Sequence, residues 1–239
     1  MEPKPWYPDD FKFVLSNTLT EEHVDKILIK RGCSSRFVYG MLMLPTILKH
    51  FIAASKDSNL QKNMTQATLY GYKLYQVTKS NTPVIAPSSD PLASVDGVLI
   101  FGLDSQQRNS IYRLEGRSTR LVNVQVEISC RKDNDNVRSL RRIEAGTFAW
   151  TGDKQDLLLT GASFWKVDDL LKSPFYQNTE ESKINKSKAK TPPPTENVLA
   201  IGTSFELPIR RPESHLNALR RRFESRSGNI LDDIEWPDK

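Results

Sequence analysis

The sequence has few of the residues that build disulfide frameworks and zinc sites. Its 239 residues include two cysteines, Cys33 and Cys130, and three histidines. The cysteines stand far apart and in no metal-binding spacing, and the histidines are scattered. The pattern therefore favours a reducing compartment without disulfides and argues against a zinc site. We expect neither a metal nor another cofactor.

Long apolar runs are also missing. No stretch approaches the roughly 20 apolar residues that a membrane-spanning helix needs. The N-terminal stretch MEPKPWYPDDF is acidic and proline-rich, and it lacks the apolar segment of a signal peptide. These absences predict a cytoplasmic protein that has no membrane partner.

The charge balance is only mildly basic, with a formal net charge of +5. Such an excess permits acidic partners but does not require them. The run RRRFESR at residues 220–226 has the composition of a nucleic-acid patch, and a solvated helix face explains it as well. From Thr179 onward, eleven Lys and Arg are balanced by ten Asp and Glu, so the tail has no basic excess that attracts a polyanion. We expect no nucleic-acid partner.

The residue composition and periodicity of the chain change twice, and we expect domain boundaries at these points. Residues 1–34 form an N-terminal extension that lacks periodicity at first and then contains one helix. Residues 35–178 hold the predicted strands and the remaining helices. Residues 179–239 begin rich in lysine, serine and proline, which predicts a disordered linker followed by a tail with a short amphipathic helix.

Capping residues and apolar periodicity predict helices in the first two regions. Thr20 is a plausible cap for the first, and Asp104 or Ser105 for the third. Glycine follows both of these helices, as it commonly does at helix ends. The four expected helices cover residues 21–31, 45–54, 105–115 and 162–176.

Short apolar or alternating runs predict strands at residues 36–38, 67–77, 82–89, 94–103, 119–130 and 143–150. Gly71 is expected to kink the second strand, and residues 131–142 to form a polar loop. The strands are short, bear glycine and alternate irregularly with helices. This arrangement favours an α+β domain on a small, curved, closed sheet over a doubly wound parallel sheet.

One stretch, SRFVYGMLMLPTILKHF at residues 35–51, has two interpretations. It can be a buried strand, a tight turn at Tyr39 and Gly40, and a core helix. It can also be a turn whose backbone amides bind an anion, because glycine lets the backbone approach a ligand closely.

The order of the motifs is more informative than any one of them. FVYGML precedes a helix; ATLYGYKLY, TPVIAP and VDGVLIFGL follow; a helix ending in RLEG leads to an alternating valine strand. This order resembles the gamma-glutamylcyclotransferase-like family, including its plant and fungal avirulence-induced-gene-like branch. AGTFAW and FWKVDDLLKSPFY are similar to that family's closing strand and helix. The likeness covers roughly residues 36–176 and implies a small mixed β-barrel with packed helices.

The resemblance implies an acyltransferase that needs no cofactor. The α-amine of a γ-glutamyl group attacks its own γ-carbonyl, giving 5-oxoproline and releasing an amine or peptide. Glu115 occupies the family's general acid/base position, and Tyr39, Gly40, Met41 and Leu42 form the substrate-binding turn. A partly buried carboxylate with a raised pKa can both accept and return the proton.

Two departures from the family pattern leave an alternative open. Met41 stands where relatives carry Ser or Thr, and the aromatic residue expected after Glu115 and Gly116 is missing, although Arg120 can match a family arginine. A glutamate at a helix end is also commonly solvent-exposed, and a helix C-terminus disfavours its charge. The alternative is a catalytically altered member that acts as a scaffold, binding a protein partner through the barrel and tail. A serine hydrolase is disfavoured because no G-x-S-x-G elbow occurs.

Overall fold

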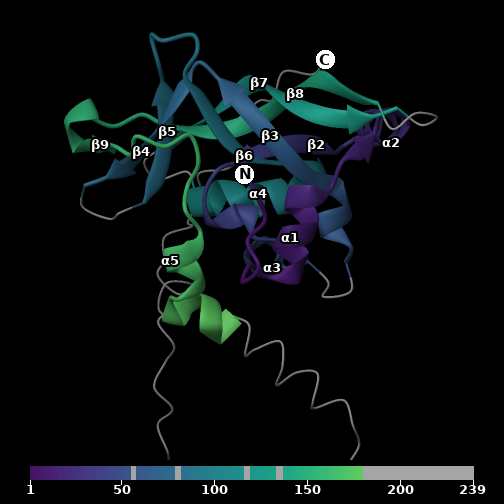
Figure 1. The fold of residues 1–239 in the computed structure, drawn as a ribbon, viewed down its shortest axis with the longest axis horizontal. Helices are drawn as coiled ribbons and strands as arrows, with labels where there is room; N and C mark the ends of the chain where they lie inside the picture. Colours follow the sequence, from purple (N-terminus) through teal and green to yellow (C-terminus); the bar gives the residue numbers. More distant parts are fainter. Residues whose placement is uncertain (55–57, 79–81, 116–118, 133–136, 180–239) are drawn as a thin grey trace, which may run out of the picture. The chain divides into compact units, whose positions relative to one another are not determined.

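A computed structural model describes most of the first three quarters of the chain, at residues 1–54, 58–78, 82–115, 119–132 and 137–179 (Figure 1). The contacts group Met1–Pro192 as one unit, and all described residues belong to it. The predicted linker, tail and short amphipathic helix at residues 180–239 lie outside the described residues.

Five strands form a closed ring, and Figure 1 shows them above the helices α1, α3 and α4. They are β2 (Ser34–Val38), β3 (Met64–Tyr70), β6 (Ser94–Leu103), β7 (Thr119–Arg131) and β8 (Arg138–Trp150). The order is β7-β3-β6-β2-β8, and pairing of β8 back to β7 closes the ring. Strand β2 runs antiparallel to β6 and parallel to β8. The predicted small mixed β-barrel is therefore confirmed, with the two-residue β1 (Leu19–Thr20) added at the edge of β7.

The barrel interior is filled by apolar side chains from alternate strand positions. Phe37, Leu99 and Val126 are among its fully buried members. Packing is tight enough to require glycine at position 97 of β6, where an added Cβ would lie 2.3 Å from the carbonyl oxygen of Val38. The alternation seen in the sequence is thus the inward and outward alternation of the strands.

A three-stranded antiparallel sheet extends beside the barrel, in the order β5 (Pro83–Pro87), β4 (Tyr72–Val77) and β9 (Leu157–Leu159) (Figure 1). Gly71 joins β3 to β4 with φ of +76°, a conformation that favours glycine. The kink expected at Gly71 is confirmed, and it divides the predicted strand between two sheets. Strand β5 begins at Pro83, which lines the cavity described below.

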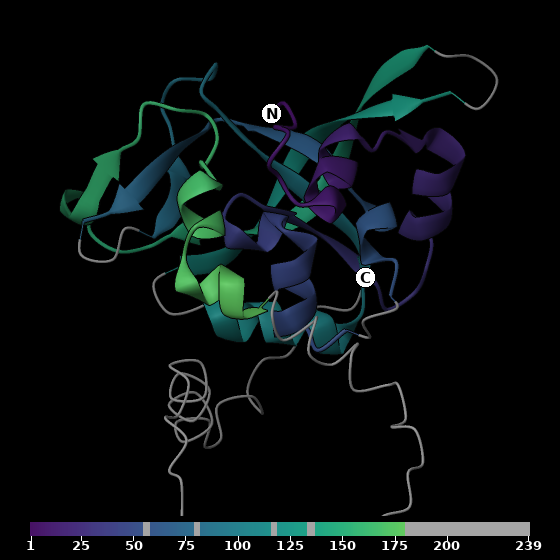
Figure 2. The ribbon, with the colours of Figure 1, turned by 60° about the horizontal axis from the view of Figure 1, so that its bottom comes forward.

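Helices pack on one outer face of the barrel around a second apolar cluster. Figure 2 shows α3 (Pro45–Phe51) between α1 (Asp9–Ser16) and α4 (Ser105–Glu115). A further helix, α2 (Glu21–Leu28), packs instead through its buried Val24 on the apolar cluster of the barrel. Its cap is Thr20, whose hydroxyl accepts a hydrogen bond from the backbone N–H of His23 at 3.1 Å. The predicted cap of this helix is confirmed. No helix in the described part of the chain is long and apolar enough to cross a membrane.

Helix α4 matters most because it ends at the predicted acid/base residue. Asp104 Oδ1 accepts from the N–H of Gln107 at 2.8 Å, and Gln107 Oε1 accepts from the N–H of Asp104 at 3.1 Å. This reciprocal pair is a capping box with Asp104 as the cap. Of the two caps considered from the sequence, the structure selects Asp104 over Ser105.

Three expectations about elements were wrong. Helix α1 forms where no regular element was expected, because two helical turns are too short to establish periodicity. The expected polar loop at residues 131–142 is largely strand: β7 continues to Arg131 and β8 starts at Arg138. These hairpin ends are mostly exposed, so they carry no apolar pattern.

The helix expected over residues 162–176 is the third error. The chain is irregular before α5 (Asp168–Leu171), and after a break at residues 172–173 a second helical stretch covers residues 174–179. Ser163 accounts for the difference, since its carbonyl oxygen accepts from the N–H of Asp96 at 2.7 Å and its hydroxyl donates to Asp96 Oδ2 at 2.9 Å. Contacts with β6 therefore override the local helical pattern in this segment.

Candidate active site

A cavity of about 400 Å³ opens at the end of β2, beside the last turn of α4. All five residues singled out from the sequence contribute to its lining, namely Tyr39, Gly40, Met41, Leu42 and Glu115. Sequence reasoning had grouped them only through the family resemblance, because Glu115 stands far from the turn in the chain. The fold brings them together since β2 and α4 meet at the same end of the barrel.

The turn at residues 39–42 connects β2 to a short 3₁₀ helix, η1 (Met41–Met43). The N–H of Met43 donates to the carbonyl oxygen of Gly40 at 2.9 Å, which closes the turn. A side chain at position 40 would crowd Pro83, since an added Cβ would lie 3.2 Å from its Cγ. Glycine thus lets the backbone itself form the cavity surface between β2 and β5.

Tyr39 is held in one orientation and stays neutral. Its side chain is buried, and its hydroxyl donates to the carbonyl oxygen of Phe148 at 2.6 Å. Burial, together with the nearby charge of Glu115, raises the pKa of the phenol far above its usual range. Tyr39 therefore supplies shape and a fixed edge to the cavity and does not act as a base.

Glu115 is the last residue of α4. It is only partly exposed, although a glutamate at a helix end is commonly exposed to solvent. Burial raises the pKa of its carboxyl from 4.5 to about 7. No side chain in the described part of the chain donates a hydrogen bond to this carboxylate. The hydroxyl of Thr119 binds the backbone carbonyl oxygen of Glu115 at 2.6 Å, which fixes the end of the helix.

The Glu115 carboxyl can be either protonated or ionised in this cavity. A pKa of about 7 means that acid and carboxylate are both well populated near neutral pH. Among the described residues that line the cavity, Glu115 is the only one with a formally charged side chain. The site can therefore accept a proton and return it, with the other lining residues providing an uncharged surface.

Several lining residues had no functional signal in the sequence. Trp165 and Leu170 lie in the stretch predicted to be a helix, yet both line the cavity. Phe148 and Pro83 do so as well, although their motifs, AGTFAW and TPVIAP, predicted only strands. By contrast, Arg120, considered as a match to a family arginine, is exposed and does not belong to the described lining.

The described residues contain no group of three or more His, Cys, Asp or Glu side chains that could hold a metal ion. In the cavity, Glu115 can transfer a proton and the backbone amides of the turn can bind an anion.

A family model described as gamma-glutamyl cyclotransferase, AIG2-like, matches residues 36–166, more than half of the chain. The chain belongs to this family. The match includes every residue proposed for the site, from the turn at Tyr39 to Glu115. Among curated proteins, none matches the chain.

Several solved structures are similar at low sequence identity. One Arabidopsis thaliana protein is 19% identical, with 73% of this chain and 98% of that chain covered and a TM-score of 0.43. A second Arabidopsis protein is 20% identical, covering 67% and 95%, with a TM-score of 0.40. A yeast gamma-glutamyl cyclotransferase specific to glutathione is 13% identical, covering 68% and 89%, with a TM-score of 0.37. The family assignment rests on the match of residues 36–166, not on these distant likenesses.

Proposed function

We propose that the protein is a γ-glutamylcyclotransferase-type acyltransferase, which converts a γ-glutamyl amine or peptide to 5-oxoproline and releases the amine. The observation that carries this proposal is Glu115, whose pKa of about 7 makes it fit for proton transfer in the cavity that residues 39–42 also line. The family membership supports the same reaction class.

In the proposed reaction, one amide bond replaces another. The Glu115 carboxylate takes a proton from the substrate's α-ammonium group, and the resulting amine attacks the γ-carbonyl carbon. The bond from that carbon to the leaving nitrogen then breaks, while Glu115 as an acid returns the proton to that nitrogen and the ring nitrogen loses its extra proton to the released amine or to solvent. No oxidant, reductant or cofactor is needed for the balance.

Binding is assigned to the turn at residues 39–42. Backbone amides at Gly40, Met41 and Leu42 are suited to the substrate carboxylate or to the oxyanion that develops during attack. Because the reaction is intramolecular, orientation alone can lower the barrier by about 7–11 kcal/mol in favourable systems. A rigid turn and a fixed Tyr39 support such positioning.

A second candidate is a member of the family that binds without turnover, and Met41 favours it. This side chain lines the cavity at the position where relatives carry a hydroxyl residue. A γ-glutamyl compound would then bind without release of 5-oxoproline, and removal of the residues after Tyr176 would abolish the main protein interaction.

We also propose that the protein belongs to the plant and fungal branch of its family and acts in the cytoplasm. It would have no nucleic-acid or membrane partner. Residues 179–239 are the proposed contact for a protein partner, because their charges are balanced and they follow the family match.

The test is release of 5-oxoproline from γ-glutamyl amino acids, γ-glutamyl-lysine and glutathione. Wild type is compared with Glu115→Gln, and Glu144→Gln is the matched control because Glu144 is exposed on β8. We expect release by wild type and the control and none by Glu115→Gln. A folded wild-type protein that releases nothing from any compound would favour the binding candidate instead.

A further inference from the structure

Part of the cavity wall is built by residues 163–170, which we name the wall segment. It runs irregularly from the region after β9 into α5. Trp165 and Leu170 line the cavity, and Val167 between them is only 2% exposed and packs into the outer apolar cluster. A wall of irregular chain needs supports at both ends to keep a fixed position.

The first support lies on the barrel. Asp96 of β6 binds Ser163 through both its backbone N–H and its carboxylate, at 2.7 and 2.9 Å. The other carboxylate oxygen of Asp96 accepts from the hydroxyl of Thr68 on β3 at 2.9 Å. The start of the wall segment is therefore fixed to two barrel strands.

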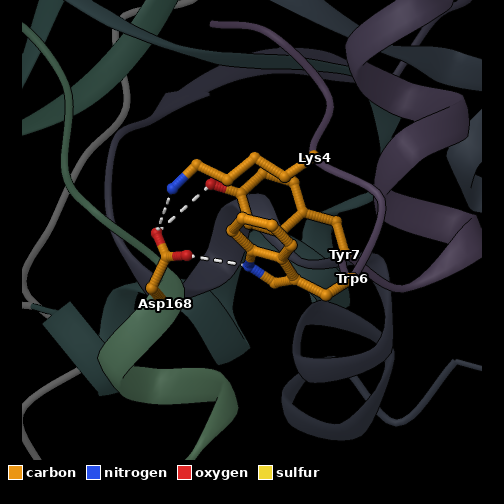
Figure 3. Close-up of polar contacts among 4 residues, drawn as sticks. All are labelled: Lys4, Trp6, Tyr7 and Asp168. Carbon is orange, nitrogen blue, oxygen red and sulfur yellow. Dashed lines mark hydrogen bonds and ion pairs between the residues drawn. The ribbon is translucent and has the colours of Figure 1, made fainter.

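The second support comes from the N-terminal region, at the other end of the wall segment (Figure 3). Asp168 Oδ2 accepts from Lys4 Nζ at 2.8 Å and from the hydroxyl of Tyr7 at 3.4 Å, while Asp168 Oδ1 accepts from Trp6 Nε1 at 2.9 Å. Both carboxylate oxygens are thus engaged by one short stretch, residues 4–7. The Trp6 side chain is 66% exposed, so burial does not account for its hydrogen bond to Asp168.

The stretch at residues 4–7 is itself anchored. Tyr7 is buried and its ring centroid lies 5.3 Å from that of Phe11, a fully buried residue of α1. The ammonium group of Lys4 also lies 5.3 Å from the Trp6 ring centroid and 5.4 Å from that of Tyr7. The contact therefore joins the wall segment to the helical layer over the barrel.

We propose that residues 4–7 and Asp168 form a clasp that sets the position of Trp165 and Leu170, and thereby the affinity of the cavity for its substrate. Asp168 is then a positioning residue, since it lies outside the described cavity lining. The kinetic part of this inference rests on the proposed function. Since the polar contacts of the clasp in the described residues all lie between residues 4–7 and Asp168 and none reaches Glu115, its loss should weaken binding more than the chemical step.

The test combines hydrogen exchange of the wall segment with steady-state kinetics of the full chain. Asp168→Ala removes the clasp, and Asp168→Asn keeps an oxygen for Trp6 while losing the ion pair with Lys4. Asp169→Ala is the matched control, because Asp169 is the exposed neighbour in the same helical turn. We expect exchange in residues 163–170 to accelerate severalfold in Asp168→Ala, less in Asp168→Asn, and not in the control.

With the panel substrate that wild type turns over best, KM should rise severalfold in Asp168→Ala while kcat changes little. Lys4→Met should give a smaller effect of the same kind. In the double variant Lys4→Met/Asp168→Ala, the two effects should not add, because both substitutions remove the same ion pair. Lys4→Met also keeps the test usable where Asp168→Ala does not fold.

The possible outcomes separate the clasp from the proposed function. Equal exchange in Asp168→Ala and Asp169→Ala would overturn the clasp, whatever the activity. Faster exchange with an unchanged KM would overturn its role in substrate affinity. Faster exchange in a protein that never releases 5-oxoproline would uphold the clasp as a support of the wall and overturn the proposed reaction.

Discussion

At the scale of the residue, Glu115 combines two requirements that usually conflict. A buried carboxyl is destabilising when ionised, and proton transfer at neutral pH needs a group that is ionised about half of the time. Burial of its carboxyl at the end of α4 raises its pKa to about 7. This environment supports the proposed acid/base role.

The same pKa predicts a pH-dependent stability difference. In the unfolded chain the carboxyl titrates near 4.5, and in the folded protein near 7, so the folded state binds more protons between these values. The contribution of the Glu115 carboxyl to the free energy of unfolding is therefore fully present below about pH 4.5 and is lost as the pH rises through 7. Glu115→Gln cannot ionise and should be more stable than wild type at pH 8, by at most ~3 kcal/mol.

Urea unfolding of wild type, Glu115→Gln and the exposed control Glu144→Gln at pH 4.5, 6 and 8 measures this difference. The gap between wild type and Glu115→Gln should be small at pH 4.5 and should grow toward pH 8. Equal stability of the two proteins at pH 8 would contradict a raised pKa at Glu115.

At the scale of the element, α4 carries Glu115 to the cavity, and its capping box fixes where the helix starts. Asp104→Ala should lower the free energy of unfolding by about 1 kcal/mol, because the N–H of Gln107 then loses its acceptor. Gln106→Ala is the control, since its side chain is exposed on the same turn. Urea denaturation tests this, and an unchanged midpoint for Asp104→Ala would exclude the cap as a source of stability.

The sequence could predict local features of the elements, but it could not predict contacts between distant parts of the chain. The cap at Thr20, the kink at Gly71 and the alternation along β7 depend on a few neighbouring residues, and each was predicted correctly. The wall segment depends on partners far away in the chain: Ser163 on Asp96, and Asp168 on Lys4, which is 164 residues distant. No local pattern predicts such contacts, so Trp165 and Leu170 were placed in a predicted helix and not in a cavity.

At the scale of the whole molecule, the closed barrel holds β2 and β8 close enough for Tyr39 to bind the backbone of Phe148. The barrel in turn depends on close packing at Gly97, where an added Cβ would also lie 2.7 Å from the Phe37 ring. The sequence predicted the barrel and the site residues through the ordered motifs of a family. It did not predict how the N-terminal region packs, since only the folded chain brings α1 against the helical layer.

Gly97→Ala should therefore destabilise the whole barrel, by roughly 1–3 kcal/mol, because the backbone of β2 has to move. Ser94→Ala, at the start of the same strand, is the control and should change stability little. Thermal unfolding followed by circular dichroism would measure the loss. A Gly97→Ala protein as stable as wild type would show that β2 and β6 are packed less closely than the structure indicates.

The most direct test of the account is 5-oxoproline release at pH 7 by wild type and Glu115→Gln, with folding of both verified. We predict release by wild type from at least one γ-glutamyl compound, and a loss of about 100-fold or more in Glu115→Gln, the lower range for general acid/base catalysis. A folded Glu115→Gln protein with full activity would contradict the central claim that this carboxyl moves the proton.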